Sequence, residues 1–216
     1  MAGKVMSDVY LSVVIPCFNE AKRLGPTLEK IVRFLSQKSF PWEIVVVDDG
    51  SGDNTARLAE EKLARFPHQI LRQGTNQGKG EAVKRGMLAA QGRFLLFTDA
   101  DLSTPIEETE LLLLKLKNGF DVAIGSRDLP DSRVEIHQNF LRETMGKIFN
   151  RIARVTSFKK IHDSQCGFKC FRQDAARSLF QAQKLKGFSF DAEILYLAQK
   201  RRYRIAEVPV TWRNSP

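Results

Sequence analysis

The sequence predicts an α/β domain in which a mostly parallel central sheet is flanked by helices. Short, almost continuous apolar runs at residues 13–15, 44–47 and 94–98 are typical of strands that are buried on both faces. Amphipathic segments with helical spacing separate these runs. Repeated alternation of strand and helix favours parallel strands joined by helical crossovers.

Each element of the first half has a local signal. Leu28, Ile31, Val32 and Leu35 form one apolar stripe at helical spacing, which predicts an amphipathic helix. The apolar runs before and after it predict buried strands. The expected elements are, in order, a strand at 9–16, a helix at 27–38, a strand at 44–47, a helix at 54–65, a strand at 69–72, a helix at 79–90 and a strand at 94–98.

The helix after these elements has a start signal of its own. Thr104 suits the N-cap, Pro105 suits the first helical position, and Glu107 stands three residues after the cap, as in a capping box. Beyond about Gly125 the pattern is less regular. The chain shows no long linker, so residues 1–216 are interpreted as a single domain. The remaining expected elements are a strand at 121–124, helices at 139–156 and 190–200, and a strand at 205–211.

Composition limits the kinds of protein that the chain can be. It is 43% hydrophobic and 27% charged, which is ordinary for a soluble domain with a packed core. Residues 1–8 lack the apolar core of a signal peptide, and no stretch approaches the ~20 apolar residues of a membrane helix. Three cysteines do not form a disulfide framework and indicate a reducing compartment.

The net charge of +9 suits an anionic partner, such as a nucleic acid, a membrane surface or a phosphorylated ligand. The densest basic clusters lie at residues 159–160 and 200–202. A nucleic-acid-binding domain would use this charge. It would leave the carboxylates at the strand ends unexplained, because they repel phosphate unless a metal ion is present.

The most informative motif is Asp99-Ala100-Asp101, directly after the expected strand at 94–98. Two carboxylates two residues apart can reach one cation, and hard oxygen ligands suit Mg²⁺ or Mn²⁺. Alone, the motif also fits a surface turn. Polar clusters at 16–20 and 48–51 follow two other expected strands, although the second could equally cap the next helix. Parallel strands bring their carboxyl ends to one edge, which favours a shared ligand site.

A glycine-rich segment, residues 76–80, precedes the expected helix at 79–90 but is not a phosphate-binding loop of the Walker type. That pattern needs four residues between its glycines, whereas Gly74 and Gly78 are separated by three. Gly80 also replaces the required Ser or Thr. We expect these glycines to allow close backbone packing beside the ligand.

Together, these motifs resemble the family 2 glycosyltransferases with the A-type, nucleotide-sugar-binding fold. The matching segments are 14–20, 46–51, 76–80, 99–101 and 125–127, and the resemblance covers about residues 10–212. Segments 163–171, 188–193 and 207–212 resemble polyprenyl-phosphate glycosyltransferases, with dolichyl-phosphate β-glucosyltransferases more similar than the mannose synthases. The resemblance implies a nucleotide-sugar-binding half at about 9–127 and an acceptor-side half at about 128–216.

The resemblance also implies roles for individual residues. Asp99 and Asp101 would hold Mg²⁺ or Mn²⁺ against the donor diphosphate. Arg127 and Arg142 would bind phosphate through the forked donors of their guanidinium groups, and Asp163 would orient groups. The implied catalytic residues are Asp101, Arg127, Arg142 and Asp163, and the implied donor-binding residues are Pro16, Phe18, Glu20, Val47, Asp49, Lys79, Asp99 and Ala100.

The implied reaction is metal-dependent, inverting transfer of a sugar to a polyprenyl (dolichyl) phosphate, with UDP-glucose as the favoured donor. The acceptor phosphate is already anionic, so it needs no general base. GDP-mannose or another UDP-sugar remains an alternative donor. A protein or polysaccharide hydroxyl remains an alternative acceptor, and it would need a base such as Asp191 or Glu193.

The lipid acceptor implies peripheral membrane contact, expected near Lys159 and Lys160, and a place in the cytoplasm or at the cytoplasmic face of a membrane. No nucleic-acid partner is expected. Related mannose synthases often carry a metal-binding Gln where this chain has Ser103, so water would complete the metal shell. Members of the family usually continue with a basic segment beyond the last strand, whereas this sequence ends at Pro216, which implies weaker donor or acceptor binding.

Overall fold

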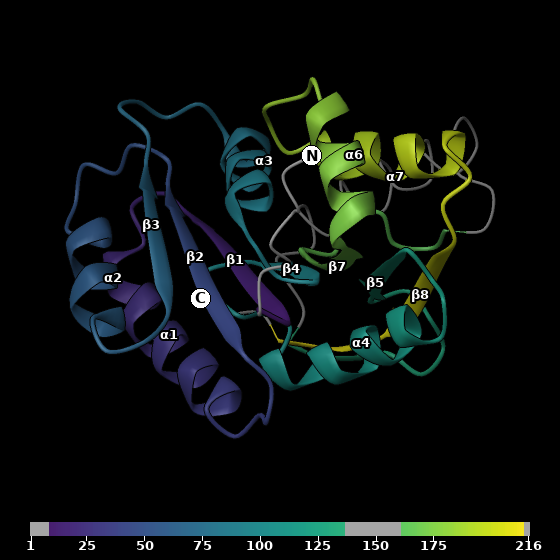
Figure 1. Ribbon diagram of the computed structural model, residues 1–216, viewed down its shortest axis with the longest axis horizontal. Helices are drawn as coiled ribbons and strands as arrows, with labels where there is room; N and C mark the ends of the chain where they lie inside the picture. The colour runs from purple at the N-terminus through teal and green to yellow at the C-terminus, as the bar shows by residue number, and fades with distance from the viewer. Residues whose placement is uncertain (1–8, 137–160, 214–216) are drawn as a thin grey trace, which may run out of the picture.

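The computed structural model describes residues 9–136 and 161–213 (Figure 1). Its elements are β1 (Leu11–Cys17), α1 (Ala21–Leu35), β2 (Trp42–Asp48), α2 (Thr55–Leu63), β3 (His68–Arg72), α3 (Lys79–Ala89), β4 (Phe94–Thr98), a 3₁₀ turn (Ile106–Glu108), α4 (Thr109–Lys117), β5 (Val122–Ser126), β6 (Arg133–Ile136), β7 (Phe168–Arg172), α6 (Gln173–Ala182), α7 (Phe190–Lys200), β8 (Ile205–Pro209) and β9 (Thr211–Arg213).

The described strands form a seven-stranded sheet in the order β3-β2-β1-β4-β7-β5-β8, and β6 pairs with β9 in a second, small sheet. Strand β7 runs antiparallel to both β4 and β5, while the other neighbouring pairs of the large sheet are parallel. The predicted α/β class with a mostly parallel sheet is therefore confirmed. The insertion of β7 also brings a strand from the second half of the chain next to β4.

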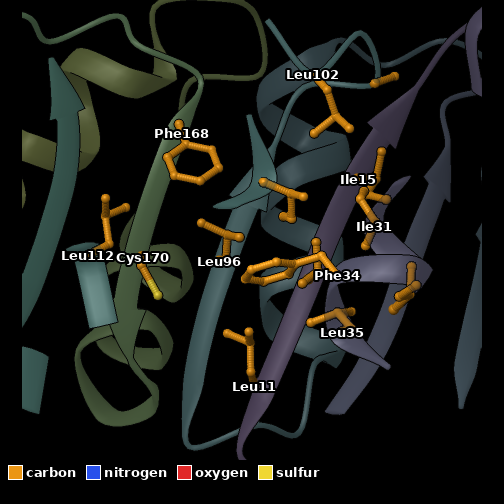
Figure 2. Close-up of a cluster of buried hydrophobic side chains, with 14 of the residues drawn as sticks. Leu11, Ile15, Ile31, Phe34, Leu35, Leu96, Leu102, Leu112, Phe168 and Cys170 are labelled. Carbon is orange, nitrogen blue, oxygen red and sulfur yellow. The ribbon is translucent and has the colours of Figure 1, made fainter. Parts of the chain in front are cut away.

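Helices cover both faces of the large sheet. On one face α1, α2 and α4 pack over alternate residues of the strands, among them Leu11, Val13 and Ile15 of β1. On the other face α3, α6 and α7 pack over the intervening residues, such as Val14. Figure 2 shows the first of these clusters, in which Phe34 of α1 lies among the apolar side chains of the sheet. Burial on both faces explains why the strands are almost continuously apolar.

Helix α1 begins six residues before the predicted start, at Ala21 instead of residue 27. The Gly25-Pro26 pair resembles a turn in the sequence, but the helix continues through both residues. The amide of Ala21 donates to the carboxylate of Asp53, and the preceding amide, that of Glu20, donates to the hydroxyl of Thr55. The start of α1 is thus fixed by residues far along the chain, which a local pattern cannot reveal.

The predicted capping box after β4 is wrong. Pro105 is extended, with ψ of 140°, and a 3₁₀ turn precedes α4, which begins at Thr109. Thr104 is buried, and its hydroxyl lies 3.9 Å from the sulfur of Cys166 rather than capping a helix. Packing against the segment before β7 decides the orientation of this side chain.

The other predicted elements differ in detail. The strands and helices of the first half lie where the pattern places them, to within a few residues. The predicted strand at 205–211 is divided into β8 and β9, which belong to different sheets. Helix α6 and strands β6 and β7 were not predicted. The predicted helix at 139–156 lies outside the described residues.

Candidate active site

A cavity of about 400 Å³ opens at the carboxyl ends of β1, β2 and β4. All three polar clusters that the sequence indicated contribute to it, and so does the glycine-rich segment before α3. It is lined by Pro16, Cys17, Phe18, Glu20, Asp49, Asn76, Gly78, Lys79, Ala82, Asp99, Ala100, Asp101 and Phe188. The predicted convergence at one edge of the sheet is therefore observed.

The segment Asp99-Ala100-Asp101 turns sharply as it leaves β4. The carbonyl of Ala100 accepts a hydrogen bond of 2.6 Å from the hydroxyl of Thr27. One oxygen of Asp101 accepts from the amide of Ser103 at 2.9 Å, and Leu102 adopts a positive φ of 47°. These contacts fix the backbone so that both carboxylates face the cavity.

Asp99 is held from two sides. Its Oδ1 lies 2.6 Å from the ammonium nitrogen of Lys79, at the start of α3. Its Oδ2 lies beside Gly167, where any Cβ would collide with the carboxylate. A glycine at position 167 is thus required for Asp99 to occupy this position.

Asp49 organises the loop between β3 and α3. Its buried carboxylate accepts hydrogen bonds of 2.8 Å from the amides of Gln77 and Gly78 and from the side chain of Gln73. Gly78 has φ of 102°, a conformation that favours glycine. Asp49 therefore both lines the cavity and shapes its wall.

Two lysines, Lys79 and Lys169, offset the negative charges of Asp99 and Asp191. Burial alone would lower the pKa of Lys79, but Asp99 and Asp191 outweigh it and raise that pKa, so the ammonium stays charged. Behind the cavity, the fully buried Lys169 contacts Asp191 at 2.5 Å and the carbonyl of Cys166 at 2.6 Å. Burial raises the pKa of Asp191, although Lys169 and Lys79 oppose that rise.

Arg127 and Asp163 form a two-pronged ion pair at the end of β5. The Nε and Nη2 of Arg127 donate to the two oxygens of Asp163 at 2.6 and 2.9 Å, and its backbone amide adds a bond of 3.1 Å. Asp163 is completely buried, whereas the Arg127 side chain is about one quarter exposed. Burial would raise the pKa of Asp163, but Arg127 outweighs it and lowers that pKa.

Most, but not all, of the predicted site residues line the cavity. Pro16, Phe18, Glu20, Asp49, Lys79, Asp99, Ala100 and Asp101 line the cavity. The side chain of Val47 does not: it is completely buried in the core beneath Gly86 of α3. Arg127 and Asp163 pair with each other outside the lining. Arg142, Lys159 and Lys160 lie outside the described residues.

The residues present fit a divalent cation held jointly by protein and ligand. Within residues 9–136 and 161–213, no group of three or more Asp, Glu, His or Cys side chains is arranged to hold a metal ion. Asp99 and Asp101 instead offer two carboxylates facing one cavity. This donor set matches Mg²⁺ sites in which one or two carboxylates share the ion with substrate phosphates and water.

Four lining residues, Cys17, Asn76, Gly78 and Ala82, were not among the predicted site residues, and sequence reasoning also missed three contributors from the second half of the chain. Phe188 lines the cavity and is 77% exposed. Gly167, just before β7, leaves room for the Asp99 carboxylate. Lys169 of β7 forms an ion pair with Asp191. Segments 163–171 and 188–193, which contain these residues, carry part of the family resemblance. The antiparallel insertion of β7, which puts Gly167 and Lys169 beside β4, has no local signal.

No described helix is both long and apolar enough to cross a bilayer.

Solved structures with the same architecture define the class of this fold. Glucosyl-3-phosphoglycerate synthase from Mycobacterium tuberculosis, crystallised with Mn²⁺, UDP and glucosyl-3-phosphoglycerate, superposes with a TM-score of 0.68 at 18% identity, over 96% of this chain and 73% of that one. Mannosyl-3-phosphoglycerate synthase from Rubrobacter xylanophilus gives 0.72 at 19% identity, over 95% and 66%. The fold is that of the A-type glycosyltransferases.

The chain belongs to glycosyl transferase family 2, whose model matches residues 12–180. It is 39% identical to a dolichyl-phosphate beta-glucosyltransferase of Trichomonas vaginalis, over 95% of this chain and 64% of the relative. Proteins of the same name from Dictyostelium discoideum and Saccharomyces cerevisiae are 39% and 35% identical, over 96% and 95% of this chain and 67% of each relative. The chain thus spans about two thirds of the length of these relatives.

Proposed function

We propose that the chain transfers glucose from UDP-glucose to a polyprenyl phosphate, such as dolichyl phosphate, with inversion at the anomeric carbon. The observation that carries this proposal is the pair Asp99 and Asp101 in a cavity that also contains Phe18, Asp49 and Lys79. Such a cavity provides acidic, basic and aromatic contacts suited to a nucleoside diphosphate. The names of the relatives support the sugar and the acceptor.

Two groups of residues would bind the donor. Phe18, 45% exposed at the cavity mouth, offers a ring for the base, and Asp49 and Glu20 offer oxygens to base or ribose. Lys79 would move its charge from Asp99 toward the diphosphate. Asp99 and Asp101 would hold Mg²⁺ or Mn²⁺. Bound there, the cation would neutralise charge on the departing diphosphate.

The acceptor end of the site would rely on arginine. Arg127 is oriented by Asp163, and a guanidinium held in this way presents fixed donors to a phosphate. Arg142 would supply a second guanidinium for phosphate. A phosphate monoester is anionic near neutral pH and can attack the anomeric carbon directly, so the reaction needs no general base.

The two carboxylates that could serve a hydroxyl acceptor are engaged elsewhere. Asp191 is buried against Lys169, and the carboxylate of Glu193 accepts hydrogen bonds from the amides of Lys184 and Leu185. Neither is among the described residues that line the cavity. This arrangement favours a phosphate acceptor over a protein or polysaccharide hydroxyl.

The enzyme would then work where its acceptor lies, in peripheral contact with the cytoplasmic face of a membrane.

A donor and acceptor screen tests the reaction. UDP-glucose, other UDP-sugars and GDP-mannose are incubated with Mn²⁺ and either a short polyprenyl phosphate or the same polyprenol without its phosphate. We expect transfer only from UDP-glucose and only to the polyprenyl phosphate. We expect chelation of the metal ion to abolish this transfer. Equal transfer to the free alcohol would contradict the proposed acceptor.

A further inference from the structure

The connection between α6 and α7 displays apolar and basic side chains to solvent. We refer to residues 184–189 as the α6–α7 loop, and all six are exposed. Leu185 is 46% exposed and Phe188 is 77% exposed, and Lys184 and Lys186 alternate with them. Figure 1 shows this connection at the edge of the molecule, beside α3.

The backbone of the loop is anchored even though its side chains are exposed. The carboxylate of Glu193 accepts from the amide of Leu185 at 2.8 Å, and Gln183 donates to the Leu185 carbonyl at 2.8 Å. The amide of Glu81 donates to the carbonyl of Lys186 at 3.1 Å. The structure therefore holds the apolar side chains out toward solvent instead of folding them into the core.

Two glycines of α3 and its preceding loop bring the α6–α7 loop close to the cavity. A Cβ at Gly78 would lie 2.7 Å from the carbonyl oxygen of Lys186, and one at Gly80 would lie 2.8 Å from that of Leu185. Phe188 itself lines the cavity, and the ammonium of Lys79 lies 5.9 Å from its ring centroid. The loop thus forms part of the rim of the candidate active site.

Exposed apolar groups alternating with lysines match the chemistry of a bilayer surface. Apolar side chains enter the boundary between headgroups and acyl chains, while lysines extend their ammonium groups to anionic headgroups. The net charge of +9 adds long-range attraction to the same surface.

We propose that the α6–α7 loop docks the chain on an anionic bilayer, so that a lipid-borne phosphate enters the cavity beside Phe188. This inference rests on the proposed function, since it is the lipid acceptor that requires the cavity rim to reach the membrane. It assigns the contact to this loop rather than to the basic pair at residues 159–160.

Vesicle binding tests the proposal. Wild-type chain is sedimented with phosphatidylcholine vesicles and with vesicles containing phosphatidylserine, at low and physiological salt. The double variant Leu185→Gln/Lys186→Gln removes one apolar and one basic side chain without touching a residue that lines the cavity. The matched control, Leu114→Gln/Lys117→Gln, makes the same chemical change on α4, which covers the opposite face of the sheet and where Leu114 is 53% exposed.

We expect the loop variant to lose about tenfold or more of its affinity for phosphatidylserine vesicles, and the control to bind like wild type. Equal binding by all three chains would overturn the proposal. So would an equal loss in both variants, or a loop variant that only changes the oligomeric state, which would make the loop an interface between copies.

Transfer assays separate this inference from the proposed reaction. The loop variant should transfer sugar normally to a water-dispersed short polyprenyl phosphate but slowly to an acceptor embedded in anionic vesicles. An equal rate with embedded acceptor would overturn the docking role. If wild type transferred sugar to neither acceptor, the proposed function would fail, while vesicle binding would still decide whether the loop contacts membranes.

Discussion

The carboxylate of Asp99 lies between Lys79, from α3, and Gly167, which precedes β7. Its position therefore depends on residues from two distant segments as well as on its own strand. Asp163 is a second case, since its buried charge is compensated by Arg127. At the scale of the residue, specific neighbours fix the positions of both Asp99 and Asp163, so a single substitution can test each contact.

The first prediction concerns Gly167→Ala. The new methyl group would collide with the Asp99 carboxylate and force that side chain to rotate. Displacing a group that positions substrate by about 1 Å can cost about 100-fold in rate, so we expect kcat/KM to fall by about 10- to 100-fold. Thermal unfolding should change little, because the flexible end of a side chain moves. The matched control is Gly187→Ala, where the added methyl meets no atom within 4 Å; equal activities of the two variants would refute the account.

The second prediction concerns acid stability and Asp163→Asn. Arg127 outweighs burial and holds the pKa of Asp163 below its unfolded value of about 3.9. The ionised carboxylate therefore stabilises the fold above about pH 4, and that contribution is lost as pH falls through the lower, folded-state pKa.

Removing this buried charge leaves Arg127 unpaired and should cost about 3 kcal/mol at pH 7. Urea unfolding between pH 2.5 and 7 should then show a weaker pH dependence for the variant than for wild type. Asp174→Asn serves as control, because Asp174 is largely exposed and lies 3.8 Å from Arg172. Parallel pH profiles for wild type and Asp163→Asn would contradict the linkage.

At the scale of the element, helix α3 follows the loop that Asp49 holds by hydrogen bonds, and its first residue is Lys79, which pairs with Asp99. It can lie close to the sheet because Gly86 faces Val14 and Val47. A Cβ there would lie 2.8 Å from the side chain of Val47 and would also collide with Val14. The approach of α3 to β1 and β2 thus sets the position of one wall of the cavity.

The third prediction compares Gly86→Ala with Gly25→Ala, both inside helices. Helix propensity favours alanine by about 1 kcal/mol at either position. At Gly86 overpacking against Val14 and Val47 costs about 1–3 kcal/mol, so we expect net destabilisation. At Gly25 the nearest side-chain atom to a new Cβ is 3.6 Å away, an ordinary contact, so we expect a neutral or stabilising change. Urea unfolding that gives the same sign for both would contradict the packing of α3.

At the scale of the whole molecule, the core on the α1, α2 and α4 face of the sheet contains all three cysteines, and Cys17 also lines the cavity. Cys17, Cys166 and Cys170 are free and at most 3% exposed. Burial raises the pKa of each thiol, that of Cys166 to about 11. Thiol reactivity therefore reports on the integrity of the whole fold.

The fourth prediction is that none of the three thiols reacts rapidly with a disulfide reagent at pH 8 in the native state. The thiolate is the reactive form, and burial limits both its population and its access. All three should react in concentrated guanidinium. Rapid modification of Cys17 in the native chain would contradict its burial beside the cavity.

The sequence predicts the features that depend on neighbouring residues and misses those that depend on residues distant in the chain. Strands and most helices are apparent because hydrophobic period is local, and the edge that gathers Asp49, Asp99 and Asp101 follows from parallel topology. Gly167 was missed as a site residue because its approach to Asp99 depends on β7 entering the sheet antiparallel, and Phe188 was missed because its loop packs against Gly78 and Gly80. The start of α1 was missed because the amides of Glu20 and Ala21 donate to Thr55 and Asp53, which are distant in the sequence.

The central claim is that Asp101 helps to hold a cation against the donor diphosphate during transfer to a phosphate acceptor. The measurement that tests it most directly is single-turnover transfer from UDP-glucose to a short polyprenyl phosphate, with saturating Mn²⁺, for wild type and Asp101→Asn. We predict a fall of about 100-fold or more in the variant, with thermal unfolding unchanged. An undiminished single-turnover rate in Asp101→Asn would contradict the claim.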